Sequence, residues 1–387
     1  MPDSFVNGRV LRDYQQDAVR EALKQEIGIL QLATGAGKTE CAIELIRKLG
    51  VPTLFIVDKV DLLNQTYDRI CNTLGLNDKI VGKIGGGNKD PAKVINVATI
   101  QTLISDINKH RDVLENSVLV IFDECHKVAS KSYTTISKYL LSAQYRIGLS
   151  ATPKREDNNE MAIYSVCGYP IFKVTTQELI QRNFLVKPTL YFFKNFNTKE
   201  EVKGMESESM PNNTINETKD YPLFYDRCVL QNNKRNNIVK KIVEKYPEDH
   251  ILILVKLKVQ GKMFAEMLNV PYFSGELKPK ERKQLMEDFN TKKIRVMVGT
   301  VSIFAEALDF PSLDTLINTV GNSGDVKSVQ MIGRPLRTFI GKTGAKYFDF
   351  IDENTFLKAS SIKRMKAFKE EGHSIQIIDV EKNKTFI

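Results

Sequence analysis

Two glycines, a lysine and a threonine lie close together in the stretch Gln31–Glu40, which reads QLATGAGKTE and begins at the end of an apolar run. Glycine allows the backbone to approach a ligand, and the N–H groups of such a loop can surround phosphate oxygens at the positive end of the following helix. Lys38 would reach the β- and γ-phosphates of a nucleotide, and the Thr39 hydroxyl would ligate Mg²⁺. An ordinary strand-to-helix turn with a surface lysine is the alternative. The spacing predicts a phosphate-binding loop of Thr34, Gly35, Ala36, Gly37, Lys38 and Thr39.

Two adjacent carboxylates follow the apolar run Val118–Phe122 in the stretch SVLVIFDECH. Ligands gather beyond the carboxyl ends of parallel strands, so these carboxylates should lie near the phosphate loop. Phosphoryl transfer needs a carboxylate for the metal ion and a group that orients water. Asp123 is therefore the candidate ligand of Mg²⁺, Glu124 would activate or position the attacking water, and His126 would couple the site to the rest of the protein. Taken alone, DECH is also compatible with a surface turn.

Apolar runs of strand length alternate with amphipathic stretches of helix length in both halves of the chain. Continuous apolar strands separated by helices predict parallel sheets that are covered on both faces. The expected strands are Gly28–Leu32, Thr53–Val57, Val94–Thr99, Ser117–Phe122 and Arg146–Ser150 in the first half, and His250–Val255, Ile294–Thr300, Thr315–Val320 and Lys346–Phe350 in the second.

This alternation predicts an α/β chain with two parallel-sheet domains in tandem, over residues 1–160 and 231–387. Residues 161–230 are expected to connect them. Within this region, residues 194–221 are polar and lack apolar periodicity, which predicts a mobile linker or loop insertion. A binding element that folds on a partner is the alternative. A basic helix is expected near the C-terminus.

The composition is typical of a globular protein, because 42% of the 387 residues are hydrophobic and 27% are charged. No uncharged apolar run approaches the ~18 residues of a membrane helix, so no membrane partner is expected. Five scattered cysteines and four lone histidines argue against a structural zinc site and fit a reducing compartment. The net charge of +9 is compatible with a polyanionic partner.

The ordered motifs resemble those of helicase superfamily 2, and the resemblance covers most of the chain. It implies two RecA-like domains with ATP and Mg²⁺ in the cleft between them. Three positions differ from the usual family pattern, namely Leu32, Ala307 and Met331. The motifs that carry the resemblance are LRDYQ (Leu11–Gln15), ATGAGKT (Ala33–Thr39), VATIQTL (Val97–Leu103), DECH (Asp123–His126), SAT (Ser150–Thr152), GTVSIFAEALDFP (Gly299–Pro311) and QMIGRPLR (Gln330–Arg337).

The resemblance also implies roles for residues outside the two central motifs. Arg12 and Gln15 would bind the nucleotide, with the Gln15 amide reading the adenine edge, and Asp309 would contact the ribose. The other positions are the coupling residues His126, Ser150 and Thr152, and the residues Thr99, Gln101 and Thr300, which would contact the nucleic-acid backbone.

In the second domain the resemblance assigns catalytic roles to Gln330, Arg334 and Arg337. The two arginines are three positions apart and can share one helical face. A guanidinium that stabilises the charge on the transferred phosphoryl group is worth roughly 10³–10⁵ in rate in other enzymes. Lys38 and Asp123 belong to the first domain, so ATP would lie between the domains and its hydrolysis would drive a hinge motion.

Within the superfamily, DECH differs from the DEAD-box RNA helicases, and the other motifs look more like DNA-directed members. These are DNA-repair helicases of the XPB type, restriction-enzyme motor subunits and phage branch-migration helicases of the UvsW type, and the compact length suggests a phage protein. The expected function is that of an ATP-dependent DNA helicase or translocase. It would act on forked, branched or single-stranded DNA through the phosphate backbone, as a monomer in the cytoplasm (the host's, if phage-encoded). An ATP-gated nucleic-acid clamp or remodeler without strand separation and an RNA helicase are the alternatives.

Overall fold

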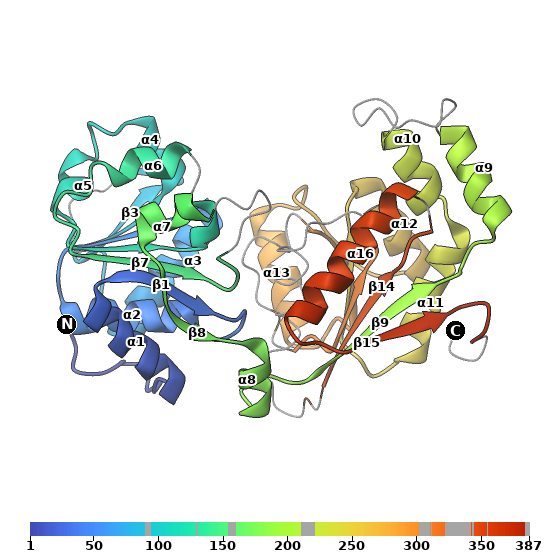
Figure 1. The fold of residues 1–387 in the computed structure, drawn as a ribbon, viewed down its shortest axis with the longest axis horizontal. Coiled ribbons are helices and arrows are strands. Elements are labelled where there is room, and N and C mark those ends of the chain that lie inside the picture. The colour runs from blue at the N-terminus through green and yellow to red at the C-terminus, as the bar shows by residue number, and fades with distance from the viewer. Residues whose placement is uncertain are drawn as a thin grey trace. The chain divides into compact units, whose positions relative to one another are not determined.

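The chain forms two compact units, Met1–Glu178 and Leu179–Ile387, each with a sheet of its own (Figure 1). The unit boundary lies inside the stretch 161–230 that the sequence predicts as a connecting region. The prediction of two α/β domains in tandem is confirmed. The computed structural model describes residues 1–89, 94–128, 131–153, 160–209, 221–301, 310, 312–321, 342, 344–353 and 355–383.

The first unit contains an eight-stranded sheet in the order β4-β3-β5-β2-β6-β7-β1-β8. All neighbouring strands are parallel except β3 and β4. The carboxyl ends of the parallel strands therefore meet at one edge, where ligand sites form in such sheets. The strands are β1 (Ile27–Leu32), β2 (Thr53–Val57), β3 (Val81–Gly85), β4 (Asn88–Lys89), β5 (Ile95–Thr99), β6 (Leu119–Phe122), β7 (Tyr145–Ser150) and β8 (Pro170–Val174).

Helices connect these strands, as the alternation of the sequence predicts. The apolar runs of β2, β5 and β6 are buried along their whole length, because helices cover both faces of a parallel sheet. The helices are α1 (Asp13–Gln25), α2 (Lys38–Leu49), α3 (Val60–Leu74), α4 (Ile100–Ser105), α5 (Arg111–Asn116), η1 (Cys125–Lys127), α6 (Lys131–Ser137), α7 (Met161–Cys167) and α8 (Thr176–Gln181), the last of which spans the unit boundary.

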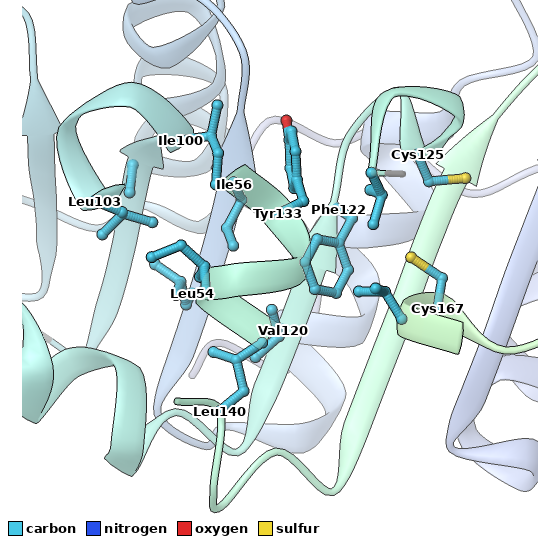
Figure 2. Packing of buried hydrophobic residues seen from close by; sticks show 14 of the residues in the cluster. Leu54, Ile56, Ile100, Leu103, Val120, Phe122, Cys125, Tyr133, Leu140 and Cys167 are labelled. Carbon is cyan, nitrogen blue, oxygen red and sulfur yellow. The ribbon is translucent and has the colours of Figure 1, made fainter. Parts of the chain in front are cut away.

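A hydrophobic cluster lies directly beneath the edge where β2 and β6 end (Figure 2). Leu54 and Ile56 of β2 and Val120 and Phe122 of β6 pack in it, and Tyr133 of α6 packs against Phe122 with ring centroids 6.4 Å apart. Close packing of this kind permits little movement of side chains or backbone. The residues that follow β2 and β6 are thus held on a rigid base.

The second unit contains a seven-stranded, wholly parallel sheet in the order β11-β12-β10-β13-β14-β9-β15. Its strands are β9 (Pro188–Lys194), β10 (Ile251–Val255), β11 (Tyr272–Phe273), β12 (Val296–Thr300), β13 (Thr315–Asn318), β14 (Ala345–Phe350) and β15 (Ile375–Asp379). Its helices include α9 (Lys199–Ser209), α10 (Tyr221–Tyr225), η2 (Asp226–Leu230), α11 (Asn233–Lys245), α12 (Lys258–Leu268), α13 (Pro279–Asn290) and α16 (Thr355–Glu370).

Three strands of this sheet, β9, β11 and β15, were not predicted. β9 lies in the expected connecting region, yet it pairs with β14 on one side and β15 on the other. β15 follows the basic helix α16 and forms one edge of the sheet. The pairing of β9 and β15 with strands far along the chain is decided by the tertiary structure and not by the local pattern.

The prediction of a loop over residues 194–221 is wrong for residues 199–209, which form α9. Thr198 and Glu201 make a capping box, because the Glu201 carboxylate accepts from the Thr198 N–H at 2.7 Å and the Thr198 hydroxyl accepts from the Glu201 N–H at 3.2 Å. Met205 then packs against a cluster that includes Phe224 and Tyr225. The cap, the packing of Met205 and the ion pair of Glu201 with Lys234 hold a helix that shows little amphipathicity.

Two buried arginines pair with aspartates at the carboxyl end of β14. Arg364 donates to both carboxylate oxygens of Asp349, at 2.8 and 2.9 Å, and to the carbonyl of Gly321 at 2.7 Å. Arg235 pairs with Asp352 and donates to the carbonyl of Thr319 at 3.1 Å. A buried charge needs such partners, and these pairs hold the chain where it leaves β13.

We expect this unit to lose stability on mild acidification because of His373, a buried residue just before β15. Burial lowers the pKa of His373 from 6.5 to about 4. Between these values the unfolded chain binds a proton that the folded unit does not, so stability falls with falling pH, by at most about 1.4 kcal/mol per pH unit. Calorimetry of the full chain from pH 7 to pH 4 should show a steeper decline in the transition of residues 179–387 for the wild type than for His373→Gln. Parallel declines would contradict this expectation.

Candidate nucleotide and nucleic-acid site

The predicted phosphate loop joins β1 to α2, which begins at Lys38. Gly35 and Gly37 have φ angles of 84° and 82°, in the left-handed region that favours glycine. A Cβ atom on Gly37 would lie 2.3 Å from the Nε2 atom of Gln15. Both glycines are therefore required by the backbone, which forms a loop at the N-terminus of a helix of twelve residues.

Three side chains of this loop carry the groups expected to hold phosphate and metal. The Nζ atom of Lys38 lies 3.4 Å from the Leu32 carbonyl, so the ammonium is folded over the loop. The Thr34 hydroxyl is buried and has no hydrogen-bond partner among the residues that the structure describes. Thr39 is the second residue of α2. A buried donor without a partner beside a glycine cradle fits a phosphate group, which would accept from it.

The first turn of α1 is attached to the loop by hydrogen bonds. The carbonyl of Ala36 accepts from the Gln15 amide at 2.8 Å and from the Tyr14 hydroxyl at 2.9 Å. Arg12 donates to the Tyr14 hydroxyl at 3.1 Å, and its backbone N–H donates to the Gln15 side chain at 2.9 Å. The structure thus brings Arg12 and Gln15 to the phosphate loop, while adenine recognition by Gln15 stays a prediction. Tyr14 was not predicted as a site residue, although it lies in the quoted motif.

The two carboxylates of DECH follow β6, which shares its carboxyl edge with β1. The Asp123 N–H donates to the Ile56 carbonyl at 3.0 Å, and its carboxylate accepts from the Glu124 N–H at 3.0 Å. Glu124 adopts φ 46° and ψ 55°, the left-handed conformation that non-glycine residues rarely adopt. Such conformations cluster at functional sites, where the surrounding structure maintains them.

A polar chain links the DECH segment to the SAT segment after β7. The His126 Nδ1 atom lies 3.3 Å from a Glu124 carboxylate oxygen and 3.3 Å from the Ser150 hydroxyl. That hydroxyl accepts from the Thr152 N–H at 3.2 Å. The Thr152 hydroxyl is buried without a partner in the described part of the chain. The three predicted coupling residues therefore lie together beside Glu124, although their role in coupling stays a prediction.

The pKa values of the two carboxyl groups, Asp123 and Glu124, are shifted in opposite directions. Burial raises the pKa of Asp123, and the neighbouring Glu124 carboxylate raises it further. Burial alone would also raise the pKa of Glu124, but the Lys38 ammonium and the hydrogen-bonded His126 outweigh that effect and lower it. A bound Mg²⁺ would favour the ionised form of Asp123, because a nearby cation lowers a carboxylate's pKa.

In the part of the chain that the structure describes, no group of three or more His, Cys, Asp or Glu side chains is arranged to hold a metal ion. Mg²⁺ typically uses one or two protein ligands together with substrate phosphates and water. One carboxylate, Asp123, and the Thr39 hydroxyl beside a phosphate cradle suit that mode of binding. The residues present therefore fit ATP with Mg²⁺.

The predicted nucleic-acid contacts also lie where parallel strands end. Thr99 closes β5, is buried, and has its hydroxyl 2.8 Å from that of Thr102. Gln101 is exposed and donates to the Asp58 carbonyl at 2.9 Å. In the second unit, Thr300 is buried at the end of β12. The predicted residues Asp309, Gln330, Arg334 and Arg337 lie outside the described residues.

Sequence reasoning did not identify Asp58 and Lys127, which form an ion pair between the ends of β2 and β6. Asp58 directly follows an apolar strand, as Asp123 does, so its position gave a signal. Its partner could not be read from the sequence, because strand order decides which segments meet.

Two domain families match the chain. Residues 9–155 match the family described as "Type III restriction enzyme, res subunit", and residues 234–339 match the "Helicase conserved C-terminal domain". The first match contains the phosphate loop and DECH, and the second contains Arg334 and Arg337. No helix of the described residues is long and apolar enough to cross a membrane.

Relatives and a solved structure extend the similarity over nearly the whole chain. A DNA 3′-5′ translocase, XPB2, of Sulfurisphaera tokodaii is 26% identical over 87% of this chain and 81% of its own length. A putative DNA 3′-5′ helicase, Rad25, of Haloarcula marismortui is 25% identical over 84% of this chain, which spans only 50% of that protein. The DNA-bound Type ISP restriction-modification enzyme LlaBIII has a similar fold, with a TM-score of 0.69 at 16% identity over 98% of this chain and 32% of its own.

Proposed function

This chain is a helicase of superfamily 2, an enzyme that hydrolyses ATP, and we propose that it uses that hydrolysis to move along DNA and to unwind or branch-migrate forks and junctions. The observation that carries this proposal is the set of contacts around Glu124. The Lys38 ammonium of the phosphate loop lowers the pKa of the Glu124 carboxyl group. The Nδ1 atom of His126 lies 3.3 Å from an oxygen of the same group. Glu124 would therefore link the bound nucleotide to His126, Ser150 and Thr152, which would transmit the change from ATP to ADP.

In the proposed mechanism the first unit binds the triphosphate. The backbone of the glycine loop and the Lys38 ammonium hold the phosphates, and Thr34 donates its unpartnered hydroxyl. Thr39 and Asp123 would hold Mg²⁺, which neutralises charge on the phosphates when bound. Glu124 positions or activates the attacking water, and its lowered pKa keeps it ionised and able to accept a proton. Arg12 and Gln15 hold the adenine end of the nucleotide.

The second unit completes the site in this proposal. Gln330, Arg334 and Arg337 would approach the γ-phosphate, and Asp309 the ribose, when the two units close on ATP. Hydrolysis removes the group that the guanidinium groups bind, so closure is favoured before hydrolysis and opening after it. His126, Ser150 and Thr152 would carry this change between Glu124 and the second unit.

DNA is proposed as the polymer because two relatives are named as a DNA translocase and a DNA helicase. Thr99, Gln101 and Thr300 would contact phosphates and sugars, which carry no base sequence and so suit a motor that must pass every sequence. The net charge of +9 favours such contacts. We propose that the chain acts as a monomer in the cytoplasm, the host's if a phage encodes it.

Rates of ATP hydrolysis and strand displacement test this function. Forked, four-way-junction and tailed-duplex DNA should each stimulate the ATPase, and labelled strands should be displaced or junctions migrated in the presence of Mg²⁺. Stimulation should weaken as salt rises, because phosphate contacts release counterions. Hydrolysis without displacement or migration on any substrate would favour the ATP-gated clamp. Stimulation by RNA but not by DNA would overturn the choice of polymer.

A further inference from the structure

Asp58 lies between two segments to which different roles are assigned. It follows β2, which pairs with β5 on one side and β6 on the other. The residues after β5 include the proposed DNA contact Gln101, and those after β6 are the DECH segment. Asp58 is therefore at the centre of three neighbouring strand ends, all at the same edge of the sheet.

One residue makes a separate contact with each of these segments. The Gln101 side chain donates to the backbone carbonyl of Asp58 at 2.9 Å. The Asp58 carboxylate forms an ion pair with Lys127, which is three positions after Glu124 and ends η1. A displacement of Gln101 thus reaches Lys127 through a single residue.

The ion pair has little to contribute to stability. The Lys127 side chain is 42% exposed and that of Asp58 is 15% exposed. Pairs near the surface are worth roughly 0–1 kcal/mol, so removing this one should leave the unit folded. The hydrophobic cluster beneath β2 and β6 contains neither residue of the pair.

We propose that Asp58 and Lys127 are positioning residues that transmit DNA engagement at Gln101 to the DECH segment. This inference rests on the proposed function. DNA bound at the end of β5 holds the Asp58 backbone through Gln101, and the ion pair then holds Lys127 and the short η1 helix in the arrangement in which Glu124 orients water. Without the ion pair, the two segments respond to their ligands independently.

The test compares basal with DNA-stimulated ATP hydrolysis in Asp58→Asn, Lys127→Met and the charge-exchanged double variant Asp58→Lys with Lys127→Asp. Each single variant should keep its basal kcat and its KM for ATP within about twofold. The DNA-stimulated kcat should fall roughly tenfold, within the range of couplings between sites. The double variant should regain most of the stimulation, because it restores an ion pair of opposite polarity. DNA affinity, measured separately, should stay near that of the wild type in all three.

Arg111→Met is the matched control, because it removes the cation of an exposed ion pair with Glu115 on α5, before β6 rather than after it. It should retain full stimulation. Single variants with wild-type stimulation, a double variant no better than the singles, or equal losses of basal and stimulated kcat would each overturn the inference. A wild-type chain without DNA stimulation would instead overturn the proposed function. If Lys127→Met does not fold by circular dichroism, Lys127→Gln gives the same comparison.

Discussion

The Lys38→Ala variant is expected to fold normally and to lose ATP turnover by roughly 10³-fold, the upper range for removal of one group that stabilises transition-state charge. Lys38 begins α2, where alanine is the best helix former, and its ammonium lies 3.4 Å from the Leu32 carbonyl at the end of β1. Nothing in that contact is needed for folding. The Lys38 ammonium, by contrast, supplies the positive charge of the phosphate loop, and the neutral methyl group of alanine cannot replace it.

The same variant should change the pH dependence of the activity that remains. Lys38 lowers the pKa of both Asp123 and Glu124, so its removal should raise the pKa of this pair. The residual rate should therefore need a higher pH than the wild-type rate. Lys48→Ala, an exposed lysine in the last turn of the same helix, is the matched control and should turn over ATP normally. Wild-type turnover in Lys38→Ala with an unchanged pH profile would mean that the loop does not bind phosphate.

The Arg334→Ala variant should bind ATP with near-normal affinity but hydrolyse it roughly 10³- to 10⁵-fold more slowly, the range known for arginine fingers. The proposed role of this guanidinium is to stabilise charge that develops only during transfer, so its loss should appear in kcat rather than in ATP affinity. Equilibrium binding of ATP and single-turnover hydrolysis separate these two quantities.

Arg20→Ala offers a control for the loss of one arginine, because this side chain is 71% exposed and forms an ion pair with an exposed aspartate, Asp17, one turn away. It should leave hydrolysis unchanged. Near-normal turnover in Arg334→Ala would show that the finger is misassigned. A parallel loss of ATP affinity and turnover would show that the arginine holds the nucleotide in its ground state instead.

Elements with local signals could be predicted from the sequence alone. The glycine loop before α2 and the buried strand before Asp123 each depend on residues within a few positions. Runs of buried apolar residues separated by helices also sufficed to predict two parallel sheets. Those features follow from backbone stereochemistry and from the burial that a parallel sheet imposes on its strands.

Tertiary structure decided which of these segments meet. The sheet order places β2 between β5 and β6, so Asp58 bonds to Gln101 and Lys127, which are 43 and 69 positions away along the chain. The tertiary structure also brings Ser150 to His126 and attaches Gln15 to the phosphate loop. In the second unit it places β9 between β14 and β15. Hydrogen bonds and ion pairs act only over a few ångströms, and local periodicity carries no information about which distant strand will be adjacent.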